Sequence, residues 1–168
     1  MPLETYLRSL GRLLFAPWEN IGAVWLGIVP LYVSLLLGEL YKSKVSFSHA
    51  VGNGFVMLWA GLNWAVHLSR LGKITYFFSD VMLPWTVTAA CIALGIFTIV
   101  LGFRKKDKGL CQVLGHTRFS SYFLILFYPM QTGMIPWNWP SVAAILIFAL
   151  PAWFVIYLLG RGLRLCIQ

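Results

Sequence analysis

The chain has 168 residues, 60% of them hydrophobic, and a net charge of +8 at neutral pH. Only 11% of the residues are charged, against roughly 25% in an ordinary soluble domain. Because the apolar residues also come in long runs, the composition excludes a typical water-soluble domain. It predicts an all-α integral membrane protein, one domain with about five transmembrane helices.

The first predicted element is an amphipathic helix over residues 1–17. Leu3, Leu7 and Leu14 recur at helical spacing, opposite a charged face. This pattern is typical of a helix that lies in the membrane surface. We expect it to end near Pro17, because proline disfavours continuation of a helix.

Five spans are predicted after this helix, each near the length that a hydrocarbon core of about 30 Å requires. Residues 74–85 are expected to return along the interface before the third span. Pro129 and Gln131 interrupt the fourth span, which is therefore expected to be short or re-entrant. The predicted spans are 21–41, 49–68, 86–103, 120–135 and 139–159.

The loop 104–119 is the most strongly charged part of the chain. By the positive-inside rule we expect it to be cytoplasmic, together with the C-terminus, and the N-terminus to lie outside. The basic residues of this loop have two interpretations. They either only determine the topology, or they contact anionic headgroups or an acidic partner. In so apolar a chain no nucleic-acid partner is expected. The basic residues are Arg104, Lys105, Lys106, Lys108 and Arg118.

A polar stripe runs along one face of the second predicted span. Polar side chains at membrane depth usually face the bundle interior or a wet cavity. Hydrogen bonding between helices is the favoured interpretation, and a pathway for a solute is the alternative. The stripe consists of His49, Asn53, Asn63 and His67.

The two histidines of the stripe are eighteen residues apart, about 27 Å along a helix. They therefore cannot share one metal ion. Either histidine alone is a minor candidate for ligating a pigment or haem, and otherwise no cofactor or metal is expected.

Small residues line one face of the first span and one face of the third. Such faces let helices approach closely, either within the chain or against a partner subunit. The residues are Gly27, Ser34 and Gly38 on the first span and Cys91, Gly95, Thr98 and Gly102 on the third.

The favoured function is a non-enzymatic subunit or scaffold of a membrane assembly, with lipids and other membrane subunits or a second copy as partners. Isolated carboxylates and the lack of an HExxH or GxSxG motif argue against an enzyme. The alternative is a small transporter or lipid-handling protein with a pathway along the second span. The third hypothesis is a lipid-modifying enzyme that uses Asp80, His116 and Arg118. It ranks last, since the expected topology puts Asp80 and His116 on opposite sides.

Overall fold

The computed structural model describes residues 3–40, 47–71, 78–105, 108–115 and 117–167. These residues contain seven helices and no strand, which confirms the all-α prediction. The helices are α1 (Leu3–Glu19), α2 (Ile21–Leu40), α3 (Phe47–Leu71), α4 (Phe78–Arg104), α5 (Lys108–Leu114), α6 (Thr117–Gln131) and α7 (Trp139–Ile167).

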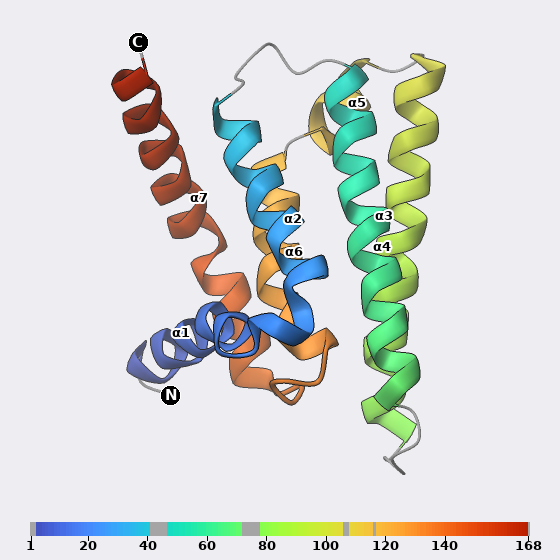
Figure 1. The fold of residues 1–168 in the computed structure, drawn as a ribbon, viewed down its shortest axis with the longest axis vertical. Coiled ribbons are helices and arrows are strands. Elements are labelled where there is room, and N and C mark those ends of the chain that lie inside the picture. The colour runs from blue at the N-terminus through green and yellow to red at the C-terminus, as the bar shows by residue number, and fades with distance from the viewer. Residues whose placement is uncertain (1–2, 41–46, 72–77, 106–107, 116, 168) are drawn as a thin grey trace.

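The long helices α2, α3, α4, α6 and α7 run alternately up and down the molecule (Figure 1). α1 lies across the lower end of this bundle and is bent by 113° from α2. A helix at such an angle to the bundle has the geometry expected of a surface helix. It continues through Pro17 to Glu19, so the predicted end at Pro17 was two residues too early.

Two segments differ from the sequence-based expectation. Residues 78–85 belong to α4, which continues through Pro84, instead of returning along the interface; residues 74–77 lie outside the described part. The segment 104–119 is not a plain loop, because it contains α5 and the start of α6. Packing of α5 against α3 and α4 explains why a charged segment folds into a helix here.

α3 and α4 form a hairpin whose backbones come into close contact. A Cβ atom at Gly54 would lie 2.8 Å from the carbonyl oxygen of Gly95, and one at Gly95 would lie 2.7 Å from the amide nitrogen of Leu58. Gly102 approaches the backbone of α3 in the same way, and Gly61 approaches that of α4. The glycines on each helix are seven residues apart, a period that keeps one seam between two helices.

α6 is the central helix of the other half of the bundle, where it packs against α1, α2, α3 and α7. Its 15 residues extend about 22 Å, which is shorter than a hydrocarbon core. The chain then turns at Gly133, whose φ of 76° suits glycine. The Asn138 side chain caps α7 by accepting from the Ser141 amide at 2.8 Å.

Two apolar clusters fill the molecule. The first lies among α2, α3, α4 and α6, around Ile28, Trp64 and Tyr128. The second joins α1 to α6 and α7, around Leu13 and Leu126. α6 contributes to both clusters, so it links the two halves of the fold.

Large apolar side chains also point outward. Leu150 is 73% exposed, Trp25 54% and Phe97 50%. Among the described helices, Met82–Arg104 is long and apolar enough to cross a membrane by itself, and the bent pair α1–α2 would provide a second span. Trp139–Val155 is apolar but shorter. Length and composition thus give one or two spans, fewer than the five expected.

Candidate functional site

Asn53 of the polar stripe joins α3 to α5 and α6. Its side chain is 2% exposed. Its Nδ2 donates to the carbonyl oxygen of Leu114, and its Oδ1 accepts from the Ser120 hydroxyl at 2.7 Å. Both ends of the amide are therefore bonded inside the bundle, as in a polar contact that holds helices together.

Asn63 makes a second polar contact with α6. The Tyr128 hydroxyl donates to its Oδ1 at 2.7 Å and lies 3.3 Å from the carbonyl oxygen of Val24 on α2. A Cβ atom at Gly27 would overlap both the Tyr128 hydroxyl and Asn63. The Tyr128 hydroxyl on α6 thus contacts both α3 and α2, and the absence of a side chain at Gly27 makes room for it. Sequence analysis missed Tyr128, because its partners are distant in the chain.

The two histidines of the stripe lie near opposite ends of α3, and both are half-buried. His49 lines a groove of about 460 Å³ between α2 and α3, together with Ser34 and Asn53. Gly38 follows Ser34 by one turn of α2. The described residues hold no group of three His, Cys, Asp or Glu side chains suited to a metal ion.

The small face of α4 turns toward other helices of the same chain. Its two glycines form the seam with α3. The Cys91 thiol donates to the carbonyl oxygen of Met57 on α3 at 3.2 Å. Thr98 is fully buried and donates to the Leu94 carbonyl of its own helix at 2.7 Å. In the structure this face is therefore occupied by the chain itself.

The basic segment sits where α4 ends and α5 begins. Arg104, Lys105 and Lys108 are exposed. Lys106 lies outside the described residues, and for Arg118 only its place in the first turn of α6 is described. α5 contacts α3 and α4, and its cysteine at position 111 is buried. The described part of the segment thus folds against this end of the bundle.

Gln131 makes a further interhelical contact that sequence analysis missed. Thr88 of α4 donates to its Oε1 at 3.4 Å. Gln131 is fully buried, and its Nε2 has no acceptor among the described residues; the same holds for Trp64 Nε1. Gln131 was recognised as an interruption of the fourth span, but its partner lies 43 positions away.

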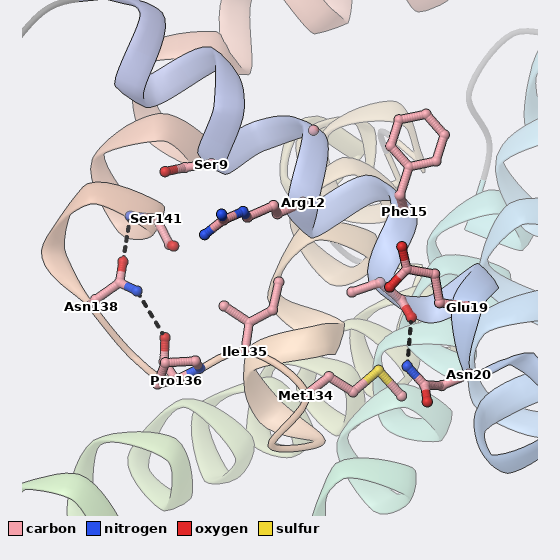
Figure 2. Close-up of a pocket in the computed structure, with 12 residues that line it drawn as sticks. Ser9, Arg12, Phe15, Glu19, Asn20, Met134, Ile135, Pro136, Asn138 and Ser141 are labelled. Carbon is pink, nitrogen blue, oxygen red and sulfur yellow. Dashed lines mark hydrogen bonds between the residues drawn. The ribbon is translucent and has the colours of Figure 1, made fainter.

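A cavity of about 840 Å³ lies between α1 and the turn that joins α6 to α7. Figure 2 shows Arg12 directed across it toward Ser9 and Ser141. Ile135 of the turn also lines it. No pattern in the sequence indicated this cavity, because its walls come from opposite ends of the chain.

Asp80 and Arg118, two residues of the third hypothesis, are not brought together. Asp80 lies in the first turn of α4 and Arg118 in the first turn of α6. These two turns are at opposite ends of the bundle (Figure 1). His116 lies outside the described residues.

Comparison with known proteins identifies no relative. No protein-family model matches the chain, and neither a curated protein nor a solved structure matches it. Function is therefore inferred from the chain's own geometry.

Proposed function

We propose that the chain is a multi-pass integral membrane protein in which α2, α3, α4, α6 and α7 form one bundle in lipid. Large apolar side chains point outward from α2, α3, α4 and α7, including Leu26, Phe55, Phe97 and Phe154. A water-soluble monomer rarely exposes apolar patches larger than a few hundred Å². α6 is shielded by its neighbours, which makes its shorter length compatible with a place inside such a bundle.

The distribution of basic residues supports one orientation of this bundle. The end of α4, α5 and the start of α6 lie at the same end as the C-terminus (Figure 1). This end carries Arg104, Lys105, Lys108 and Arg118. The positive-inside rule then places residues 104–118 and the C-terminus in the cytoplasm and α1 on the outer side.

Within the membrane we propose that the protein is a non-enzymatic subunit or scaffold. The observation that carries this is the inward pairing of its polar groups. Asn53 and Asn63 bond to other parts of the chain, and the α3–α4 glycines are covered by the chain's own backbone. What remains outside is mainly apolar surface, which suits lipid tails and the helices of partner subunits.

Mass spectrometry of the intact protein, purified in mild detergent from its native membrane, tests this role. We expect stoichiometric copies of other membrane subunits, or a second copy of this chain. A single chain that carries a specific small solute would contradict the subunit role.

Alkaline extraction of the membranes tests the membrane location separately, because an integral protein stays in the pellet.

A transporter or lipid-handling role is the second candidate. It is favoured by the groove between α2 and α3, where Ser34 and His49 line an otherwise largely apolar space. In this case a fluorescent phospholipid should bind the purified chain, and His49→Leu should weaken binding. His67→Leu is the matched control, because it lies on the same helix but does not line the groove.

A further inference from the structure

The cavity beside α1 is lined by a cation, Arg12, and by a carboxylate, Glu19, and these two side chains form no ion pair. In Figure 2 the guanidinium of Arg12 points away from Glu19. Arg12 is directed into the cavity (Figure 2), and the structure has no ion pair between Arg12 and a described acidic residue. By contrast, Arg8 pairs with Glu4 at 3.0 Å on the same helix. Both arginines are exposed, but of the two only Arg12 lines the cavity.

The opposite wall of the cavity adds features that favour an anion. Ser141 is 4% exposed, lines the cavity and lies in the first turn of α7, a helix of 29 residues. The N-terminal end of a helix carries a partial positive charge. An arginine guanidinium presents a fork of N–H donors that matches two oxygens of a phosphate. Arg12 and Ser141 thus approach the cavity from different elements with complementary donors.

The remaining walls are mixed: polar residues such as Ser9, Asn20 and Asn138 line part of the cavity, and an apolar side reaches the outer surface. Phe15 lines the cavity and is 66% exposed, and Met134 and Ile135 line it from the turn. A ligand that fits both features has a phosphate at one end and hydrocarbon at the other. A cavity at the level of a surface helix also lies where phospholipid headgroups are found.

We propose that this cavity binds the phosphate group of a phospholipid, with Arg12 as its principal contact and Ser141 as a second donor. The inference rests on the proposed membrane location but not on the subunit role. It assigns a ligand to a part of the chain that neither the polar stripe nor the basic segment includes.

Native mass spectrometry of the full chain in mild detergent, titrated with phosphatidylglycerol, tests the proposal. We expect one tightly bound lipid on the wild-type chain and about tenfold weaker binding in Arg12→Gln, because a charge-assisted contact is lost. Arg8→Gln should bind like the wild type, since it removes the same charge from the same helix outside the cavity. Equal binding by all three proteins would overturn the proposal.

Inorganic phosphate tests whether the bound phosphate group belongs to a lipid or to free phosphate. If millimolar phosphate alone raises the unfolding temperature of the wild type but not of Arg12→Gln, while no lipid is retained, the site binds free phosphate. Ser141→Ala provides a second variant should Arg12→Gln fail to fold, and we expect it to weaken lipid binding severalfold. Unchanged lipid binding by a folded Ser141→Ala variant would show that Ser141 does not contact the ligand. Alkaline extraction tests the membrane location separately. A failure of the proposed membrane location can therefore be told apart from a failure of the proposed lipid site.

Discussion

The α3–α4 hairpin and the surroundings of α6 are held together in opposite ways. In the hairpin, contact depends on missing side chains, because Gly54 and Gly95 let two backbones touch. Around α6, contact depends on side chains that reach a partner 65 or 67 positions away, as Tyr128 and Ser120 do. Added atoms should therefore destabilise the first region, and loss of a hydroxyl or an amide should destabilise the second.

The comparison separates two ways in which a helix bundle gains specificity. A glycine seam fixes the distance and register of two neighbouring helices. Hydrogen bonds between distant helices fix which surfaces face each other, since a buried polar group without a partner is costly. Substitutions in the two regions should therefore destabilise the fold for different reasons.

The largest effect is expected for Gly54→Ala. The added methyl group would lie against the backbone of α4, and overpacking of this kind costs up to about 3 kcal/mol. Unfolding in detergent, followed by circular dichroism, measures the loss. Gly52→Ala is the matched control on the same helix, because a Cβ atom there meets nothing within 4 Å. It should stabilise α3 by about 0.5–1 kcal/mol, so equal effects of the two variants would refute the seam.

Asn53→Leu should have the next largest effect, about 2 kcal/mol, because it leaves the Leu114 carbonyl and the Ser120 hydroxyl without this partner. Loosening of α5 should also expose Cys111, which is 2% exposed in the structure. Maleimide labelling with peptide mapping measures its reactivity. Ser120→Ala removes one of the two bonds and should cost about half as much. Unchanged labelling of Cys111 would show that Asn53 does not hold α5 in place.

Tyr128→Phe should have the smallest effect, about 1 kcal/mol, because only one hydroxyl is lost. A double-mutant cycle with Asn63→Ala should give a coupling energy of about 1 kcal/mol. Tyr122→Phe is the control, since its hydroxyl donates to the Ile145 carbonyl at 2.9 Å. It should lose similar stability but show no coupling to Asn63. If Tyr122 and Tyr128 showed equal coupling energies with Asn63, the specific bond between Tyr128 and Asn63 would be contradicted.

The sequence predicted best those features that depend on local periodicity. The all-α class follows from the composition, and Gly95 and Gly102 were placed on one face because glycine spacing is visible in the chain itself. The partners Gly54 and Gly61 have the same seven-residue spacing, so pairing the two patterns would have found the whole seam.

The features that escaped prediction depend on tertiary contacts. α5 has only seven residues, too few for a stable helix without packing, and its charged surroundings suggested a loop. The bond from Ser120 to Asn53 and the cavity at Arg12 join residues far apart in the chain. Spacing along one helix cannot reveal which distant surface will cover it, and a single sequence provides no further signal.

The burial of α6 has a consequence for how the chain assembles during synthesis. α6 is covered by α1, α2 and α3, which precede it, and by α7, which follows it. When α6 leaves the ribosome, the helix that completes its environment does not yet exist. Buried apolar groups of α6 such as Leu126 and Met130, which cluster with Ile145 of α7, are then still uncovered on that side. Completion of the bundle therefore waits for α7, and premature termination before Trp139 would leave the centre of the fold open.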